Sequence, residues 1–345
     1  MPDIIRVLVV DDSAYVRKVV SQMLSRSPFI EVVGTARDGA EALERVEELN
    51  PDVVTCDLNM PVMDGLAFVR AQMAKRPVPI VLISIAAEQG AQVLAALDAG
   101  AIDFVQKPTA LATEKLMDIA DELVEKVKAA ARASLRPPAA ERIRGVTPPM
   151  PMPAKSDKID IVVMGISTGG PQGLKLVIPR FPADFPVPVA IVMHMPIGYT
   201  EMYAKNLNDS CALTVVEAHD GDPIVPGTVY LAPAGRHLTF VRAGASVMAH
   251  LDVRPLDMPH RPSVDVLFHS AADAFDSRVL GVVMTGMGSD GRDGAAWIKA
   301  RGGSILTEAE ETCVVYGMPR SVVEAGLSDR VFPIDDIARA IMERV

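Results

Sequence analysis

Short runs of valine and isoleucine, each followed by a helical pattern, constrain the fold of this chain more than any other feature. Continuous apolar runs of this length are typical of central parallel strands, which helices cover on both faces. In the first third of the chain the expected strands are 6–10, 31–35, 52–56, 79–84 and 103–106. The expected helices are 14–25, 39–49, 65–74, 91–98 and about 112–131. Five such units predict a doubly wound (βα)5 domain.

The same alternation returns from about residue 158 onward. The expected strands include 159–164, 187–193, 228–232 and 279–284, the helices include 263–275 and 295–299, and a hairpin is expected near 238–252. Six prolines between Pro137 and Pro153 interrupt any hydrophobic period, as is typical of an extended linker. The predicted fold class is α/β with two doubly wound domains. They span 1–128 and 158–345, the second being Rossmann-like with a mostly parallel sheet, and a proline-rich linker covers 129–157.

Composition and charge exclude several classes of protein. With 49% hydrophobic and 23% charged residues the chain can bury sizeable cores. Its net charge of -10 argues against nucleic-acid binding, because phosphate contacts need clustered lysine and arginine. We find no signal peptide, no apolar run long enough for membrane insertion, and no cysteine spacing typical of disulfides or zinc. We therefore expect a cytoplasmic protein.

Polar side chains stand at the ends of the strands predicted in the first domain. Asp11 and Asp12 follow the first strand, and Asp57 follows the third. Ser84 ends the fourth strand, and Lys107 comes directly after the fifth. Parallel strands end at one edge of a sheet, where three carboxylates would need a cation such as Mg²⁺. The set predicts a phosphoryl-binding pocket with an aspartate nucleophile, although each acid alone could be a helix N-cap.

These residues, with VVDD, the run CDLNMPVMDG and the Lys107-Pro108 pair, resemble the receiver domain of bacterial response regulators. The resemblance implies that Asp57 is the phosphoacceptor. It also implies that Mg²⁺ is bound by Asp11, Asp12, Asp57 and the backbone carbonyl of Asn59. Ser84 is then expected to contact the phosphoryl group and Lys107 to pair with it. Phe104 is the implied aromatic switch residue.

The chain departs from the receiver pattern directly after Ser84, where a small residue is usual and Ile85 stands instead. A β-branched side chain is stiff and would crowd the mouth of the pocket. We therefore expect slower phosphotransfer or an altered lifetime of the phosphorylated state, and an Ile85→Ala variant with both rates unchanged would contradict this.

A glycine turn that carries Ser167 follows the first strand of the second domain. The residues Gly165-Ile-Ser167-Thr-Gly169 match the nucleophile elbow G-x-S-x-G, in which a tight turn exposes the serine. They also approach the dinucleotide fingerprint G-x-G-x-x-G, but Ser167 replaces the second glycine, which weakens that interpretation. From the pattern alone, a reactive serine, a phosphate loop and a plain turn all remain open.

A histidine and an aspartate follow two other strands of the second domain. His194 comes directly after VPVAIVM, and Asp290 lies in TGMGSDG after VLGVVM. At the same edge as Ser167 they are the base and the orienting acid that a nucleophilic serine needs. The alternatives are a structural histidine and an N-cap aspartate. The order Ser, His, Asp also differs from that of α/β-hydrolases.

The motifs GISTGG, HMPIGYT, HRPSVDVLFHS, TGMGSDG and CVVYGMPR resemble the catalytic domain of the chemotaxis protein-glutamate methylesterases, in which a receiver precedes that domain. The resemblance implies Ser167 as nucleophile, His194 as general base and Asp290 as the residue that orients His194. Backbone amides near Thr168 and Met287 are the implied oxyanion donors.

The implied activity is hydrolysis of glutamate γ-methyl esters on methyl-accepting chemoreceptors, with release of methanol, together with deamidation of receptor glutamines. Mg²⁺ is implied for the receiver only, and no cofactor for ester hydrolysis. Phosphorylation by a chemotaxis histidine kinase is expected to relieve inhibition by the receiver. The fragment from Lys158 onward should then be more active than the unphosphorylated chain. Ile166 stands where the family commonly has alanine or serine, and is expected to alter the packing beneath Ser167.

Three other interpretations compete with an esterase. A phosphorylation-switched adaptor with an idle esterase domain is the main alternative, and a methanol-release assay separates the two. A nucleotide-dependent oxidoreductase is disfavoured by Ser167 in the glycine loop. A DNA-binding regulator is disfavoured because no basic output domain follows the first domain.

Overall fold

The structure is a computed structural model, and it describes residues 4–84, 90–107, 113–133 and 159–345. The chain divides into two compact units, Met1–Arg144 and Gly145–Val345, and each has a parallel sheet of its own. The division falls inside the expected linker, most of which lies outside the described residues, so the domain limits stay a prediction. Within the described ranges, no helix combines the length and the apolar character needed to cross a lipid bilayer.

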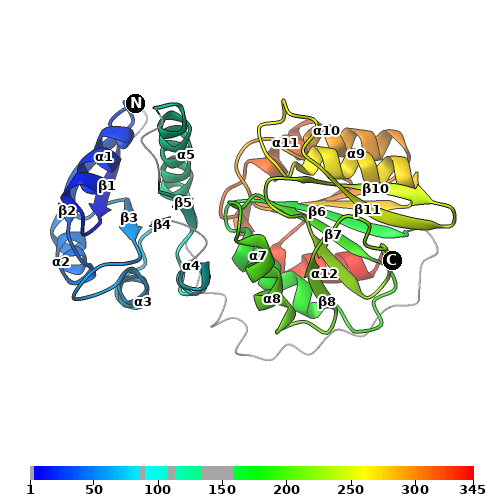
Figure 1. Cartoon of the computed structure of the whole chain (residues 1–345), viewed down its shortest axis with the longest axis horizontal. Coiled ribbons are helices and arrows are strands. Elements are labelled where there is room, and N and C mark those ends of the chain that lie inside the picture. Colours follow the sequence, from blue (N-terminus) through cyan, green and yellow to red (C-terminus); the bar gives the residue numbers. More distant parts are fainter. Residues whose placement is uncertain (1–3, 85–89, 108–112, 134–158) are drawn as a thin grey trace. The chain divides into compact units, whose positions relative to one another are not determined.

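In the residues that the structure describes, the first unit has five strands and five helices in strict alternation (Figure 1). In chain order they are β1 (Ile5–Val10), α1 (Ala14–Leu24), β2 (Ile30–Ala36), α2 (Gly39–Leu49), β3 (Val53–Asp57), α3 (Gly65–Lys75), β4 (Ile80–Ser84), α4 (Gly90–Asp98), β5 (Asp103–Gln106) and α5 (Thr113–Ala131). Every element lies within one residue of its predicted limits. The sheet order is β2-β1-β3-β4-β5, and all pairs are parallel, which confirms the doubly wound (βα)5 prediction.

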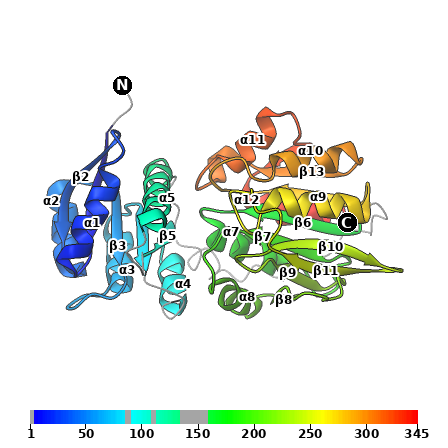
Figure 2. The ribbon, with the colours of Figure 1, turned by 45° about the horizontal axis from the view of Figure 1, so that its top comes forward.

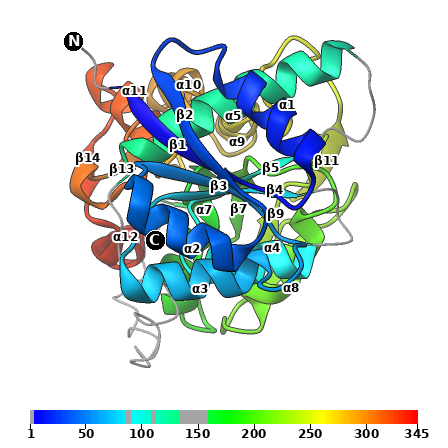
Figure 3. The same ribbon diagram turned by 90° about the vertical axis from the view of Figure 1, so that its left-hand side faces the viewer.

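Helices cover both faces of this five-stranded sheet (Figure 3). Helix α1 packs against α5, while α2 packs against α3 and α3 against α4. The edge strand β2 is partly exposed, whereas the central strands β3 and β4 are buried along their whole length. Burial on both faces explains why these strands are continuous apolar runs rather than alternating ones.

The second unit is larger and also has a parallel sheet (Figure 2). Its strands are β6 (Ile161–Ile166), β7 (Val189–Met193), β8 (Thr214–Glu217), β9 (Thr228–Leu231), β10 (His237–Ala243), β11 (Ser246–Asp252), β12 (Val279–Val283), β13 (Ser304–Glu308) and β14 (Arg330–Phe332). Its helices are α7 (Gly170–Val177), α8 (Thr200–Asn208), α9 (Val264–Phe275), α10 (Arg292–Ala300), α11 (Met318–Glu324) and α12 (Ile334–Met342). Seven strands form the sheet in the order β14-β13-β12-β6-β7-β9-β8, and β10 and β11 form a separate antiparallel hairpin.

Helices cover both faces of the seven-stranded sheet as well. On one face α9 packs against α10 and the hairpin, and on the other α7 packs against α12. Side chains of β6 alternate between these layers: Ile161 and Val163 join the core beneath α9, whereas Ile166 reaches α7. A Cβ atom at Gly173 of α7 would lie only 3.1 Å from Cδ1 of Ile166. The bulk of Ile166 is thus accommodated by a glycine on the facing helix.

Several elements of the second unit were not among the predicted ones: β8, β13, β14, α7, α8, α11 and α12. The strands among them have three to five residues, and α7 contains a proline and two glycines, so their local signals are weak. The predicted strands and helices, and the hairpin, are all present.

The strand order of each unit reverses at one point. In the first unit, β1 lies between β2 and β3. In the second, β7, β9 and β8 lie on one side of β6, and β12, β13 and β14 lie on the other. Open parallel sheets bind ligands outside the carboxyl ends of the strands that flank such a point. Those ends carry the polar residues singled out above.

Candidate active site and phosphorylation site

Ser167 occupies a tight turn between β6 and α7. The N–H of Ser167 donates to the carbonyl of Thr285, at 2.9 Å, and the N–H of Gly170 donates to the carbonyl of Ser167, at 2.6 Å. Gly169 adopts a φ of 80°, in the left-handed region that favours glycine. The turn leaves Ser167 half-buried at the carboxyl end of β6. Because its own N–H is already paired, Ser167 cannot supply an oxyanion donor.

A buried threonine supports this turn from below. The hydroxyl of Thr285 donates to the carbonyl of Thr168, at 3.0 Å, and accepts from the N–H of Val315, also at 3.0 Å. The N–H of Thr285 donates to the carboxylate of Glu308, at 2.9 Å, and Glu308 is fully buried. Sequence reasoning missed Thr285 and Glu308, although Thr285 opens the TGMGSDG motif. Together they bond the Ser167 turn to the buried core.

His194 stands beside Ser167 at the end of the neighbouring strand. Ile166 of β6 pairs with Met193 of β7, so Ser167 and His194 are the next residues of the two paired strands. The N–H of His194 donates to the carbonyl of Ile166, at 3.2 Å. Among the described residues no hydrogen bond joins the Ser167 hydroxyl to the imidazole, and the buried Nδ1 of His194 has no partner there. Catalytic hydrogen bonds often tighten only when substrate binds.

Asp290 holds the other nitrogen of the His194 ring. The distance from His194 Nε2 to Asp290 Oδ2 is 2.8 Å. A carboxylate acceptor at Nε2 fixes the proton on that nitrogen, so Nδ1 keeps its lone pair. Nδ1 is therefore the atom that can take a proton from Ser167.

Asp290 also binds the first turn of α9. It accepts from the Ser263 hydroxyl at 2.9 Å, from the N–H of Val264 at 2.8 Å and from the N–H of Asp265 at 3.0 Å. Burial works to raise the pKa of Asp290, but the hydrogen bond and charge of His194 and the two N–H groups outweigh it. The pKa of Asp290 is therefore held below its usual range, and the carboxylate stays charged.

The N-cap interpretation of Asp290 is wrong for the helix that follows it. Gly291 is the N-cap of α10, and Ser263 is the N-cap of α9. Asp290 instead reaches the start of α9 from a separate loop, where the helix dipole favours a negative charge. Its neighbour Asp265 has a pKa raised by burial and by the charge of Asp290, despite an N–H from Gly294.

Of the two oxyanion candidates, Met287 has the clearer geometry. It follows Gly286, where an added Cβ atom would lie 2.8 Å from Cβ of Ser167, so this loop passes directly beside Ser167. In the part of the chain that the structure describes, the N–H of Met287 makes no hydrogen bond. Thr168 lies next to Ser167 and its carbonyl is bound by Thr285. Both assignments stay predictions.

The acids of the first unit meet at the carboxyl ends of β1 and β3. One carboxylate oxygen from each of Asp11, Asp12 and Asp57 lies within 4.8 Å of the other two. Lys107 Nζ lies 2.6 Å from Oδ2 of Asp11 and 3.0 Å from Oδ2 of Asp57. None of the three acids is the N-cap of a described helix. The N-caps of α1, α2 and α3 are Ser13, Asp38 and Asp64, whose side chains accept hydrogen bonds from N–H groups in the first turn.

Burial and neighbouring charged groups together set the pKa values in this acidic pocket. Burial raises the pKa of Asp57, and the Lys107 ammonium opposes that rise only in part. Burial also works to lower the pKa of Lys107, but its hydrogen bond with Asp11 and the charges of Asp57 and Asp11 raise that pKa above its usual value. Lys107 therefore keeps its positive charge next to the acids.

Two of the remaining receiver residues, Ser84 and Phe104, lie on the same sheet. Ser84 ends β4 and is fully buried, and its carbonyl accepts from the N–H of Lys107, at 2.6 Å. Phe104 lies buried in β5, and Asn59 is exposed two residues after Asp57. Their roles stay predictions, and Ile85 lies outside the described residues.

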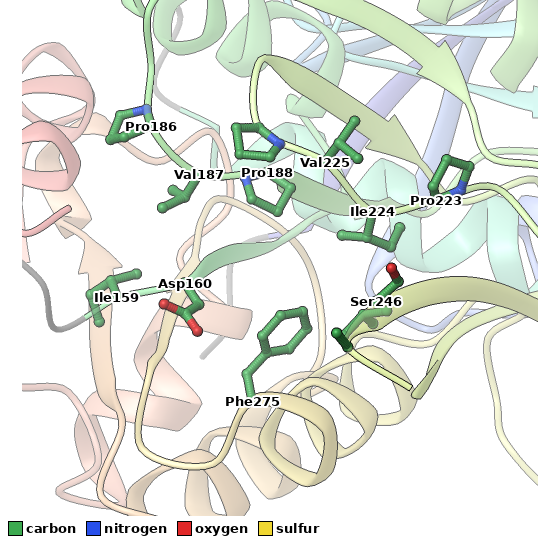
Figure 4. Close-up of a pocket in the computed structure, with 13 residues that line it drawn as sticks. Ile159, Asp160, Pro186, Val187, Pro188, Pro223, Ile224, Val225, Ser246 and Phe275 are labelled. Atoms are coloured by element: carbon green, nitrogen blue, oxygen red, sulfur yellow. The ribbon is translucent and has the colours of Figure 1, made fainter. Parts of the chain in front are cut away.

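A pocket of about 410 Å³ lies at the opposite edge of the second sheet (Figure 4). It is lined by residues that precede β6 and β7, including Ile159, Val187 and Pro188, and by Phe275. Among the described residues that line it, Asp160 is the one with a carboxylate, which is paired with Arg278 at 2.9 Å. The pocket contains none of the predicted catalytic residues, which lie at the carboxyl ends of these strands.

Known proteins match both parts of the chain. Residues 162–341 match the family model for the CheB methylesterase, and residues 7–121 match that for the response regulator receiver domain. A protein-glutamate methylesterase/protein-glutamine glutaminase of Myxococcus xanthus is 49% identical over 99% of this chain and 98% of its own. One from Halalkalibacterium halodurans is 43% identical, with the same shares of both chains covered.

A solved structure agrees with these matches. The CheB methylesterase catalytic domain of Thermotoga maritima is 43% identical, with a TM-score of 0.53, and the match covers 54% of this chain and 99% of that one. It corresponds to the part of the chain that holds Ser167, His194 and Asp290. This chain therefore belongs to the CheB methylesterase family, with a response regulator receiver domain ahead of its methylesterase domain.

Proposed function

We propose that this protein is a phosphorylation-regulated serine hydrolase that removes methyl groups from glutamate γ-methyl esters of methyl-accepting chemotaxis receptors. The observation that carries the proposal is the 2.8 Å contact between His194 and Asp290 at the strand ends next to Ser167. Both activities in the names of the full-length relatives, methylesterase and glutaminase, are hydrolyses at a side-chain acyl group. One nucleophile can serve both.

The first half of the reaction is acyl transfer to Ser167. His194 Nδ1 takes the proton of the Ser167 hydroxyl as Oγ attacks the ester carbonyl carbon. The tetrahedral intermediate collapses, the bond to the methoxy oxygen breaks, and His194 returns the proton so that methanol leaves. Asp290 stabilises the imidazolium that exists between these two proton transfers. General base assistance of this kind contributes about 10²- to 10⁴-fold in rate.

The second half restores the enzyme. His194 takes a proton from water, the resulting hydroxide attacks the acyl carbon, and the bond to Ser167 Oγ breaks with return of the proton to serine. A glutamine side chain follows the same course, with ammonia in place of methanol. The N–H groups of Met287 and Thr168 are the proposed donors to the oxyanion, and one such donor contributes about 10²- to 10³-fold.

Asp57 is the proposed phosphoacceptor of the receiver domain, and a chemotaxis histidine kinase is the proposed phosphodonor in the cytoplasm. The carboxylates of Asp11, Asp12 and Asp57 supply clustered oxygen ligands of the kind that Mg²⁺ prefers, so these residues fit that ion, with the Asn59 carbonyl as a further ligand. When bound, the ion would neutralise charge on the incoming phosphoryl oxygens. Lys107 pairs with the phosphorylated Asp57, and Ser84 contacts its phosphoryl group.

The decisive experiment measures methanol release from methyl-labelled receptor membranes. Full-length protein should release methanol, and Ser167→Ala should lower the rate to the background without protein. Ser210→Ala, which removes an exposed hydroxyl after α8, should leave the rate unchanged. Full activity in Ser167→Ala would remove this serine from the mechanism. No release by the intact chain, in the presence of a phosphodonor, would favour the adaptor with an idle esterase domain.

A further inference from the structure

The ring of a second histidine lies flat against the ring of His194. The centroids of His194 and His260 are 4.1 Å apart, and the two planes differ by 21°. His260 is exposed, whereas the side chain of His194 is only 11% exposed. Asp290 bonds the edge of the His194 ring in the proposed mechanism, whereas the contact of His260 with the face of that ring has no part in it.

A buried histidine forms hydrogen bonds with both ends of the segment that carries His260. His237 is fully buried, and its Nε2 lies 3.2 Å from the carbonyl of Pro255. Its Nδ1 accepts from the N–H of Ser263, at 3.2 Å. A neutral imidazole with its proton on Nε2 satisfies both contacts, so one side chain spans the loop from residue 255 to residue 263.

Further hydrogen bonds hold the middle of this loop. The carbonyl of Arg261 accepts from the N–H of Gly235, at 2.9 Å, and the Arg261 guanidinium donates to the carbonyl of Leu256, at 3.3 Å. At the end of the loop the Ser263 hydroxyl donates to Asp290. The loop therefore binds the orienting acid of His194 with one residue and covers the ring of His194 with another.

One hydrogen bond does not fix the plane of an imidazole. The χ2 torsion of histidine is broad, and the ring can tilt about the contact between Nε2 and Asp290 without breaking it. A flat contact on one face removes this freedom, because tilting would drive the ring into His260. The backbone of the loop cannot yield easily, since it is bonded to His237, Gly235 and Asp290.

We propose, on the basis of the esterase function above, that His260 is a positioning residue that holds the ring of His194 in the plane from which Nδ1 reaches Ser167. It acts through His194 and takes no proton in the reaction. Small displacements of a reacting group have large effects, since about 1 Å can cost on the order of 10²-fold in rate. A ring that is partly freed should lose roughly tenfold in kcat, with little change in KM.

The test compares two substitutions of His260 in the full-length protein. His260→Ala removes the flat contact, and His260→Phe keeps a planar ring without nitrogen atoms. His269→Ala is the matched control, because His269 is also exposed and also stacks on a ring, that of Trp297, with centroids 4.1 Å apart and planes at 17°. Methanol release should fall about tenfold in kcat for His260→Ala, recover largely in His260→Phe and stay unchanged in His269→Ala.

A second measurement does not depend on the substrate. The ring nitrogens of His194, labelled with ¹⁵N and assigned by their loss in His194→Gln, should give one sharp set of signals in the starting protein and in His260→Phe. In His260→Ala they should shift and broaden as the ring moves. If no protein releases methanol but these signals change, the proposed function fails and the positioning role stands. The proposal would be overturned if His260→Ala left both kcat and the signals unchanged. It would also be overturned if His260→Phe lost as much kcat as His260→Ala.

Discussion

The Nε2 atom of His194 lies 2.8 Å from Oδ2 of Asp290, although the two residues are 96 positions apart in the chain. The same carboxylate accepts three further hydrogen bonds from the start of α9. One acid thus joins the loop after β12, the first turn of α9 and the residue after β7. The orientation of the proposed base depends on the packing of all three.

Substitution of Asp290 by asparagine should inactivate the enzyme while leaving the fold largely intact. The amide keeps much of the shape and one oxygen acceptor, but it no longer favours a proton on His194 Nε2 or stabilises the imidazolium. We expect kcat for methanol release to fall by roughly 10³- to 10⁴-fold. Ser263→Ala removes one donor to Asp290 and should have a much smaller effect. Equal losses in both variants would contradict a role of the charge itself.

Thr285 should prove to be a support of the nucleophile turn. Thr285→Val conserves volume but removes the hydroxyl that bonds the Thr168 carbonyl and the Val315 N–H. Leaving buried groups unpaired costs about 1–3 kcal/mol each, so the free energy of unfolding should drop by that order. Urea unfolding followed by the fluorescence of Trp297, the one tryptophan, reports on this domain. Thr239→Val on β10 is the control. An equal drop in the free energy of unfolding for that variant would show that Thr285 has no special role in supporting the turn.

Phosphorylation should depend on Asp57 and be coupled to esterase activity. With a small-molecule phosphodonor and Mg²⁺, the full-length chain should gain one phosphoryl group, detected by intact-protein mass spectrometry, and should release methanol faster. Asp57→Asn should show neither effect and should retain the basal rate. Asp52→Asn, which alters an exposed acid before β3, should behave like the starting protein. Stimulation that persists in Asp57→Asn would place the phosphoacceptor elsewhere.

The methylesterase domain should lose stability in acid through His237. Burial lowers the pKa of His237, although the Pro255 carbonyl opposes this, so the folded state favours the neutral ring. As the pH falls below the ordinary pKa of about 6.5, the unfolded chain binds a proton that the folded chain resists, and the free energy of unfolding drops.

Urea unfolding read by Trp297 fluorescence between about pH 8 and pH 5 checks this prediction. His237→Gln should be less stable at the upper end and should show a shallower loss toward acid. His219→Gln, at an exposed histidine, should keep the slope of the starting protein. Parallel curves for all three proteins would show that His237 does not contribute.

The elements of the first unit follow from local pattern alone. Its central strands β3 and β4 are buried along their whole length, and Ser13, Asp38 and Asp64 are the N-caps of α1, α2 and α3, so apolar runs and caps mark the limits of these elements closely. In the second unit β13 was missed because the short run SILTE ends in a glutamate that is fully buried. No local rule places a charged residue in a core. Its hydrogen bonds with Thr285 and Thr312, which are distant or outside the strand, help to compensate for burial of the carboxylate.

The sequence by itself determined the α/β class, the strand ends at which polar residues gather, and the turn at Ser167, because these depend on neighbours within a few residues. Only the tertiary structure decided that Asp290 binds Nε2 of His194, that Thr285 and Glu308 support the nucleophile turn, and that His260 covers the His194 ring. Those contacts join loops from distant parts of the chain. Their geometry is set by how strands and helices pack, and no periodicity along the chain encodes it.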